Sequence, residues 1–285
     1  MNINETCIEC IINQSVKVSN AIKADNNLSH TLTSTVKDMS KNFSLDQTPP
    51  DIAADVYQKM AELAQKDDLY DEIKELSTKK ALSLVPQLKQ RLQHSNNKLL
   101  TATKIAVAGN VIDLAAAVEF DLDEELKKIF YTNFDIDNFS NLQQQLSKAK
   151  KVVILGDNVG EHIFDYIFIE TLKDLYPNTK YHYLVRGTPI INDVTIKEAK
   201  EAGFDKLCSL IDSGVNTPGF SYNKANTVSQ ELFNSADLII SKGMGNYECL
   251  TPISRKNICF LLKIKCDVVA NSLNGKVGDI VCKLV

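Results

Sequence analysis

The strongest constraint on the fold is an alternation of short apolar runs and amphipathic segments that begins near Lys150. Three largely apolar runs have the length of a strand and end in a polar or glycine-containing turn: Val152–Leu155, Tyr181–Val185 and Ala236–Ile240. The segments between them carry apolar residues at helical spacing: 160–176, 195–202 and 228–234. Strands that alternate with helices predict an α/β fold with a doubly wound, mostly parallel sheet.

The first 148 residues show helical periodicity without runs of this strand type. Five segments carry apolar residues every three or four positions: 5–24, 28–43, 52–63, 68–94 and 99–118. The third follows Thr48-Pro49-Pro50, and proline is well tolerated in the first turn of a helix. We therefore predict an N-terminal all-helical cap over residues 1–148 and an α/β domain over residues 149–285.

Composition narrows the possible partners. The 285 residues include 32 Lys and Arg against 36 Asp and Glu, so the net charge of −4 gives no electrostatic indication of nucleic-acid binding. No apolar run approaches the roughly 18 residues of a membrane span. The N-terminus has neither the basic nor the apolar region of a signal peptide, so we expect a cytoplasmic protein that does not bind membranes. The sequence leaves the oligomeric state open.

The polar residues that directly follow the predicted strands are the first candidates for function, because ligands of open α/β sheets bind beyond the carboxyl ends of the strands. Asp157 and Asn158 follow the first strand, and two adjacent oxygen-bearing side chains suit a hard divalent cation. The alternative is that one of them simply caps the next helix. Backbone N–H groups near Gly160, at the start of that helix, suit a phosphate.

Two further loops follow the next strands. Asp193 adds a possible acidic ligand or a plain helix cap, and Arg186 suits either a phosphate or a surface ion pair. Lys242, followed by Gly243 and Gly245, suits an anion cradle. Asp212 precedes another polar loop that we expect to line the same crevice. Neither a Walker A motif nor a Gly-x-Gly-x-x-Gly fingerprint is present.

A Cys-x-x-Cys pair, Cys7 and Cys10, lies at the start of the first predicted helix. Thiols at a helix N-terminus suit a redox or a metal-binding role, whereas a buried, reduced pair is the plain structural alternative. A structural zinc site usually needs four ligands, and no second Cys-x-x-Cys occurs. Cys266 and Cys282 are possible further ligands, but the sequence does not place them in space.

Six strings between residues 7 and 248 together resemble one family. In chain order they are Cys7-Ile-Glu-Cys10, Thr48-Pro49-Pro50, Ala108-Gly109-Asn110-Val-Ile-Asp113, Gly156-Asp157-Asn158-Val-Gly160-Glu161, Arg186-Gly-Thr-Pro189-Ile-Ile-Asn192-Asp193-Val-Thr195 and Ser241-Lys242-Gly243-Met-Gly245-Asn246-Tyr247-Glu248. They resemble the damage-control phosphatase family, formerly catalogued as domain of unknown function eighty-nine, and most of all its microbial branch with an N-terminal Cys-x-x-Cys.

The resemblance implies a divalent metal, Mg²⁺, Mn²⁺, Co²⁺ or Ni²⁺, at the strand ends below a helical cap. It implies three metal ligands: Asp157, Asn158 and Asp193. It implies catalytic roles for Asp157, Glu161 and the phosphate-binding Lys242. Substrate contacts are expected from Arg186, Asn246, Asp212 and Asn110, with Asp113 and residues 215–222 near the leaving group.

The reaction that the resemblance implies is metal-dependent hydrolysis of small phosphate monoesters, either sugar phosphates or damaged phosphometabolites. The nucleophile is either the Asp157 carboxylate or a water activated by the metal. Two alternatives stand beside this enzyme. One is a metal- or metabolite-binding module without turnover. The other is an S-adenosylmethionine-dependent carboxyl methyltransferase, which is disfavoured because no glycine-rich loop for the methyl donor is visible.

Overall fold

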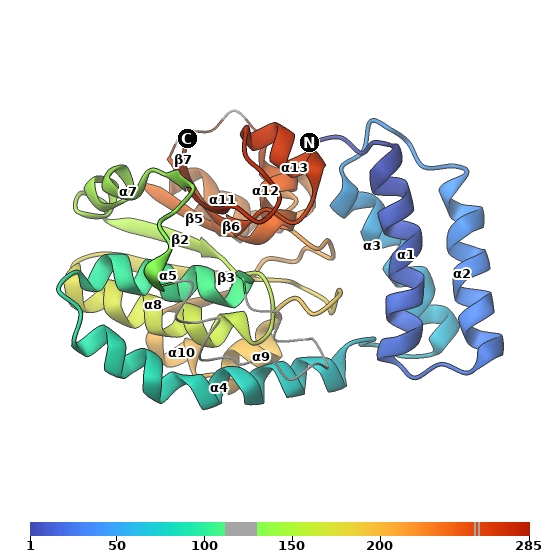
Figure 1. Cartoon of the computed structure of the whole chain (residues 1–285), viewed down its shortest axis with the longest axis horizontal. Coiled ribbons are helices and arrows are strands. Elements are labelled where there is room, and N and C mark those ends of the chain that lie inside the picture. Colours follow the sequence, from blue (N-terminus) through green and yellow to red (C-terminus); the bar gives the residue numbers. More distant parts are fainter. Residues whose placement is uncertain (112–129, 254, 256) are drawn as a thin grey trace.

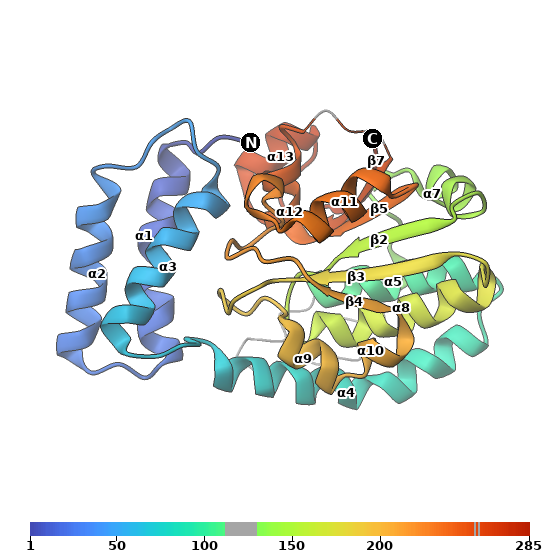
Figure 2. The ribbon, with the colours of Figure 1, turned by 180° about the vertical axis from the view of Figure 1, so that it is seen from behind.

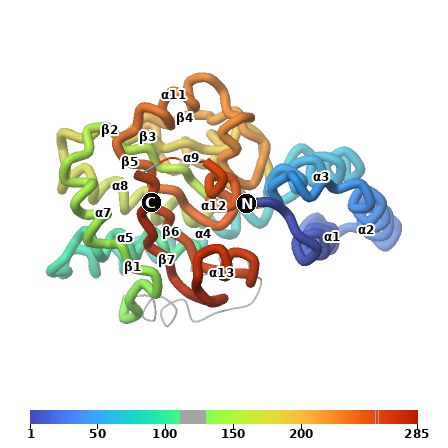
Figure 3. Tube along the Cα trace, turned by 90° about the horizontal axis from the view of Figure 1, so that it is seen from above, coloured from blue at the N-terminus to red at the C-terminus, as the bar shows by residue number. Residues whose placement is uncertain are grey.

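A computed structural model of the chain describes residues 1–111, 130–253, 255 and 257–285. A three-helix bundle stands beside a larger α/β body, as Figures 1 and 2 show. Viewed from above in Figure 3, the bundle lies to one side of the body and does not cover either face of its sheet. Within the described residues, no helix is both long enough and apolar enough to span a membrane.

The bundle consists of α1 (Glu5–Ala21), α2 (Asn26–Ser40) and α3 (Pro49–Ala64). Each helix begins at a residue whose side chain accepts a hydrogen bond from a backbone N–H of the first turn: Asn4, Asp25 and Thr48. The apolar positions of the three helices form a cluster of their own, so the helical periodicity of this region is confirmed.

The body is built on one seven-stranded sheet with the order β1-β7-β6-β5-β2-β3-β4. Its strands are β1 (Ile136–Asp137), β2 (Lys151–Leu155), β3 (Lys180–Val185), β4 (Ser209–Asp212), β5 (Leu238–Lys242), β6 (Ile258–Lys263) and β7 (Ile280–Leu284). Neighbouring strands are parallel except for β6 and β7. The predicted α/β class with a mostly parallel sheet is therefore confirmed.

Helices cover both faces of this sheet (Figures 1 and 2). One face carries α5 (Lys98–Val111), α7 (Phe139–Leu146), α8 (Glu161–Leu175) and α10 (Phe204–Leu207), with α9 (Ile196–Glu201) alongside and α4 (Asp71–Gln93) outermost. The other face carries α11 (Thr227–Ser235), α12 (Gly243–Leu250) and α13 (Asp267–Leu273). In β2, Val152 and Ile154 pack toward the first layer, and Val153 and Leu155 toward the second. Burial on both faces explains its uninterrupted apolar run.

The apolar clusters divide the chain differently from the predicted boundary at residue 148. Ala102, Ala106 and Val107 of α5 belong to the same core as the sheet, and α4 packs on α5 and α8. In the described part of the chain, α1–α3 pack in a different cluster, to which Ile190 of the loop after β3 also contributes. Helical periodicity identifies a buried face but not the element that covers it.

The order in which consecutive strands are added to the sheet changes direction at β2. The neighbours of β2 are β3 on one side and β5 on the other, and both are parallel to β2. The loops that leave β2 and β5 therefore diverge to opposite faces and open a crevice at the carboxyl edge. The bundle lies beyond that same edge (Figures 1 and 2).

A buried ion pair joins the two parts of the molecule. Lys74, in the first turn of α4, is 2% exposed, and its Nζ lies 2.7 Å from Oδ2 of Asp68 and 3.5 Å from Oε1 of Glu198. Asp68 belongs to the connection from the bundle, and Glu198 belongs to α9 of the body. The amine is thus shared by carboxylates on both sides of the junction.

Replacement of Lys74 by methionine should lower the free energy of unfolding by about 3–5 kcal/mol, because it leaves two carboxylates at the junction without their cation. Urea denaturation measures this change. Lys23→Met is the matched control, since Lys23 makes a 2.7 Å pair with Glu72 at an exposed site, and this substitution should change the free energy of unfolding little. Equal effects of the two substitutions would contradict this role of Lys74.

Candidate active site

Backbone hydrogen bonds join the loop after β2 to the loop after β3. Val194 N donates to Asp157 O at 2.8 Å, and Val159 N donates to Asn192 O at 2.7 Å. These bonds form a short antiparallel bridge that pairs Asn158 with Asp193. Asp193 therefore lies beside Asp157 and Asn158 at the carboxyl edge of the sheet, although it is far from them in sequence.

Arg186, the first residue after β3, is buried within this group. Its Nε donates to Oδ2 of Asp193 at 2.7 Å, and its Nη2 lies 3.9 Å from Oδ1 of Asp157. Nη2 is buried and has no hydrogen-bond partner in the described structure. Burying a guanidinium N–H without an acceptor costs free energy. Nη2 is therefore available to donate a hydrogen bond to an oxyanion.

The side-chain amide of Asn110, in α5, contacts both Asp157 and Glu161. Its Nδ2 lies 3.1 Å from Oδ2 of Asp157 and 3.3 Å from Oε2 of Glu161, while its Oδ1 accepts a hydrogen bond from Lys263 N. Asn158 Nδ2 also donates to Oδ2 of Asp157, at 2.9 Å. Two amides therefore hold one oxygen of Asp157, and the other oxygen faces Arg186.

Lys242, at the end of β5, is fully buried between two carboxylates of α8. Its Nζ donates to Glu161 at 2.5 Å and to Asp165 at 2.6 Å, and Tyr183 Oη donates to the second oxygen of Asp165 at 3.0 Å. Burial lowers the pKa of this amine, but Asp165 and Glu161 outweigh it, so that the pKa rises and the amine stays charged. The amine is enclosed by its own carboxylates.

Glycine allows the chain to approach these side chains closely. Gly243 has a φ of +75°, and a Cβ there would lie 1.9 Å from Oδ2 of Asp157. A Cβ at Gly109 would lie 2.7 Å from Cγ of Glu161. Either substitution would require a carboxylate of the site to move, which ties these glycines to the site's geometry.

The buried cluster carries more negative than positive charge. Among the described residues, four carboxylates, those of Asp157, Glu161, Asp165 and Asp193, pair with two buried cations, Arg186 and Lys242. A third buried cation, Lys74, acts on Asp193 without forming an ion pair with it. Burial raises the pKa of Asp157 well above its usual range, and Glu161 and Asp193 raise it further. Burial also raises the pKa of Asp193, against the opposing charge of Arg186. A cation would relieve this excess.

The donor set is consistent with a hard divalent ion. Asp157, Asn158 and Asp193 offer two carboxylates and one amide, the oxygen ligands that such ions prefer. In the part of the chain that the structure describes, no three His, Cys, Asp or Glu side chains are already arranged as metal ligands. The three predicted ligands include an amide, so they are not a set of that composition.

The backbone N–H of Gly160, which the sequence suggested for phosphate binding, has a partner within the protein. Gly160 N donates to Nδ1 of His162 at 3.0 Å within the protein interior. Burial lowers the pKa of His162 to about 4, so the ring is neutral at neutral pH and accepts this bond. The Gly160 N–H is therefore used to hold the turn before α8.

Two other predicted residues have structural partners. Asn246 is fully buried, donates to Gly156 O and Lys242 O, and accepts from Phe220 N, so it joins the loop after β2, the end of β5 and the segment at Phe220. Asp212 is exposed and accepts a hydrogen bond from Gly214 N. Asp113 lies outside the described residues.

Three residues at or near the site, Asp165, Tyr183 and Lys265, were not predicted from the sequence. Asp165 follows Glu161 by four positions in a largely apolar helix, a spacing that places both on one face and was a usable signal. Lys265 follows β6 at the same edge of the sheet, is exposed, and its charge lowers the pKa of Asp157. Tyr183 lies inside an apolar strand and carried no such signal.

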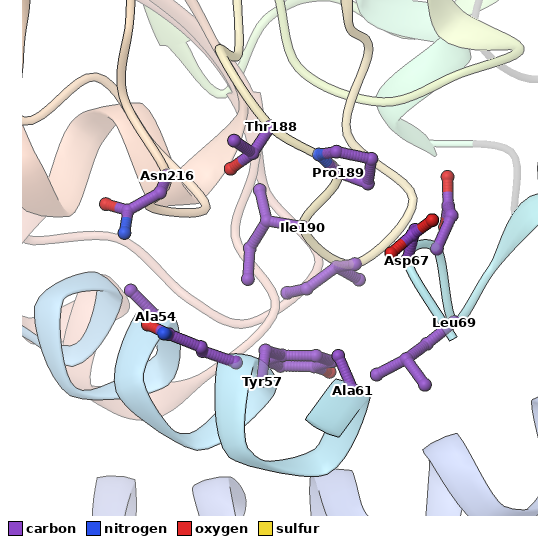
Figure 4. A pocket seen from close by; sticks show the side chains of 12 residues that line it. Ala54, Tyr57, Ala61, Asp67, Leu69, Thr188, Pro189, Ile190 and Asn216 are labelled. Atoms are coloured by element: carbon purple, nitrogen blue, oxygen red, sulfur yellow. The ribbon is translucent and has the colours of Figure 1, made fainter. Parts of the chain in front are cut away.

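A cavity of about 430 Å³ lies between α3 and the loop after β3 (Figure 4). Tyr57 and Ala54 of α3 line one side, and Thr188 and Ile190 line the other. Ile190 O accepts a hydrogen bond from Asp193 N at 3.0 Å. The same short loop therefore borders the cavity and carries a predicted metal ligand.

Comparison with known proteins identifies the family of this chain. Residues 3–281 match the damage-control phosphatase ARMT1-like domain. The chain belongs to this family. It is 31% identical to a damage-control phosphatase from Pyrococcus horikoshii, over 99% of this chain and 98% of that protein. It is 30% identical to a damage-control phosphatase from Archaeoglobus fulgidus, over the whole length of both.

A solved structure shares the fold. The crystal structure of a DUF89-family protein from Pyrococcus horikoshii superposes with a TM-score of 0.92 at 30% identity, and covers 100% of this chain and 99% of that one. The resemblance inferred from the six sequence strings is confirmed.

The buried carboxylates should make the metal-free protein less stable as the pH rises. Burial raises the pKa of Asp165 to about 6, against the opposing charge of Lys242, so the folded state binds a proton between about pH 4 and 6 that the unfolded chain releases. The free energy of unfolding should therefore fall across this window, by about 2–3 kcal/mol from this group.

Urea denaturation of wild type and Asp165→Asn in EDTA, at several pH values, isolates this contribution. The variant lacks the titrating carboxyl, whereas His162 and the remaining carboxylates titrate in both proteins. The difference in unfolding free energy between the two should change with pH in favour of the variant as pH rises from 4 to 6. A constant difference would contradict the prediction.

Proposed function

We propose that this protein is a metal-dependent phosphatase that hydrolyses small phosphate monoesters. The observation that carries the proposal is the excess of buried carboxylate charge directly beside the unpartnered Nη2 of Arg186. The excess negative charge suits a divalent metal, and the unpartnered N–H suits an oxygen of a phosphate group. The damage-control phosphatases among the relatives support the same activity.

Asp157, Asn158 and Asp193 are the residues that would hold the ion, which we propose to be Mg²⁺, Mn²⁺, Co²⁺ or Ni²⁺. When bound, such an ion neutralises charge that develops on phosphate oxygens. Arg186 orients Asp193 through its Nε and offers Nη2 to a second acceptor. Asn110 and Asn158 fix one oxygen of Asp157.

Arg186 and Lys265 are the basic groups available to the phosphate. Nη2 of Arg186 is free within the site, and Lys265 is exposed at its mouth. Lys242 is neither free nor exposed, because Glu161 and Asp165 enclose its amine. We therefore propose that Lys242 is a positioning residue that holds Glu161 beside Asn110 and Asp157.

The cavity of Figure 4 is where the remainder of the ester would lie. It borders the Asp193 loop, and its lining combines apolar side chains with the polar groups of Thr188, Gln58 and Asn216. Such a mixed surface suits a sugar phosphate or a damaged phosphometabolite of similar size. The bundle thus contributes to recognition and the sheet edge to chemistry.

Purified protein should release phosphate from such esters with one of the four metals, and EDTA should abolish release. Asp193→Ala should lower kcat/KM by on the order of 10²-fold or more, because a metal supplies several kcal/mol of transition-state stabilisation. Phosphate release across a panel of monoesters measures both effects. Asp205→Asn, an exposed carboxylate of α10, is the control and should retain activity. Metal binding without release of phosphate from any ester would refute the proposal.

Lys242→Gln and Lys265→Gln should have opposite kinetic signatures. The first should lower kcat with little change in the inhibition constant of inorganic phosphate, because the amine acts through Glu161. The second should weaken phosphate inhibition and raise KM, because an exposed contact contributes to binding of the ground state. A loss of phosphate affinity in Lys242→Gln as large as that in Lys265→Gln would show that Lys242 contacts the phosphate directly.

A further inference from the structure

The loop after β3 contains a turn with a strained backbone. Asp193 N donates to Ile190 O at 3.0 Å, which closes a four-residue turn with Ile191 and Asn192 at its centre. Ile191 has a φ of +46°, whereas the other described non-glycine residues with a positive φ are lysine, glutamine and asparagine. Turns with a positive φ at the first central position usually carry Gly, Asn or Asp there, because a β-branched side chain is crowded by its own backbone. Contacts outside the turn must therefore hold Ile191 in this conformation.

The helical bundle contacts the first half of this turn. Ile190 is 5% exposed and belongs to the apolar cluster of α1–α3, and Ile191 packs against the same cluster. Tyr57 of α3 and Leu69, which follows that helix, are members of the cluster and line the cavity of Figure 4 together with Ile190 and Ile191. Burial of these apolar side chains against one another stabilises the docked bundle and offsets the strain of the turn.

A hydrogen-bonded chain joins the other end of the loop to the connection between the bundle and α4. Oε2 of Glu198 accepts hydrogen bonds from Thr195 N at 2.9 Å and from Thr195 Oγ1 at 2.6 Å. Oε1 of the same carboxylate lies 3.5 Å from Nζ of Lys74, which also pairs with Asp68. The loop is therefore held at both of its ends, with Asp193 between them.

The middle of the loop faces the candidate active site. Val159 N donates to Asn192 O at 2.7 Å, and the carboxylate of Asp193 accepts from Nε of Arg186 at 2.7 Å. Asn192 and Asp193 directly follow Ile191, so a change in the backbone of Ile191 would displace both. The position of the Asp193 carboxylate thus depends on the conformation of Ile191.

We propose that Ile191 is a positioning residue: the bundle holds its backbone in the left-handed region, and this conformation fixes Asp193 beside Asp157. The inference rests on the proposed function insofar as Asp193 is a metal ligand. The bundle then acts on the strand edge through this loop, in addition to lining the cavity. Undocking of the bundle would release the strain at Ile191 and, with it, the position of Asp193.

Ile191→Gly tests the proposal because the alternatives predict opposite results. Glycine adopts a positive φ freely, so a turn governed by its own backbone should become no less rigid. We expect instead that loss of the bundle contact outweighs this gain, and that the amides of Val159, Asp193 and Val194 exchange faster by on the order of tenfold or more. Amide hydrogen exchange of the full-length protein in EDTA measures this change. The amides of the central strand β2 report whether the whole body opens.

Three further variants isolate the bundle contact. Ile191→Val keeps a β-branched apolar side chain and should exchange like wild type. Leu69→Ala removes apolar contact from the bundle side without altering the loop, and should speed exchange at the same three amides. Gln65→Gly is the control for strain: Gln65 ends α3 at an exposed position with a φ of +51°, so glycine relieves strain there and the loop should exchange as in wild type.

The affinity for Mn²⁺ connects the loop to the site, and the electron paramagnetic resonance signal of the free ion measures it without any ester. Ile191→Gly should bind Mn²⁺ roughly tenfold more weakly than wild type, as is typical when the support of a metal ligand is lost. Ile191→Val should match wild type.

Two exchange results for Ile191→Gly would overturn the proposal: loop amides that exchange no faster than in wild type, or an equal acceleration in β2. An unchanged Mn²⁺ affinity in a variant whose loop exchanges faster would overturn it as well. A wild-type protein that binds no Mn²⁺ would refute the metal site of the proposed function instead. The exchange of Ile191→Gly and Leu69→Ala would then still decide whether the bundle holds the loop.

Discussion

The geometry of the candidate active site depends on one buried cation. Lys242 Nζ lies between Glu161 and Asp165, and all three side chains are excluded from water. Two carboxylates one helical turn apart can occupy this interior only because a strand delivers an amine between them. Through this contact β5 is joined to α8, and Glu161 is held against Asn110 of α5. One strand and two helices therefore meet at that point.

The internal ion pairs do not neutralise the site completely. Arg186 pairs with Asp193, and Lys242 is shared by Glu161 and Asp165, which leaves Asp157 without a full counter-charge. The uncompensated charge lies at the edge of the sheet, next to a guanidinium N–H without a partner. A metal would balance the excess negative charge, and a phosphate group would accept a hydrogen bond from the unpartnered guanidinium N–H.

Much of the fold was predictable because its signals are local. The apolar run of β2 and the helical period of α8 each reflect burial of that element alone. The positions of Asp157, Asn158, Asp193 and Arg186 followed from one rule, that loops after parallel strands share an edge. Asp165 was missed because its importance comes from a lysine 77 positions later in the chain.

The sequence by itself determined the order of helices and strands, the class of the sheet and the residues that reach its carboxyl edge, since periodicity and strand-end position are properties of short segments. Only the tertiary structure decided that α4 and α5 belong to the body and that the amine of Lys242 is enclosed. These outcomes depend on contacts between distant segments, because burial and charge compensation are set by whichever surfaces finally pack together.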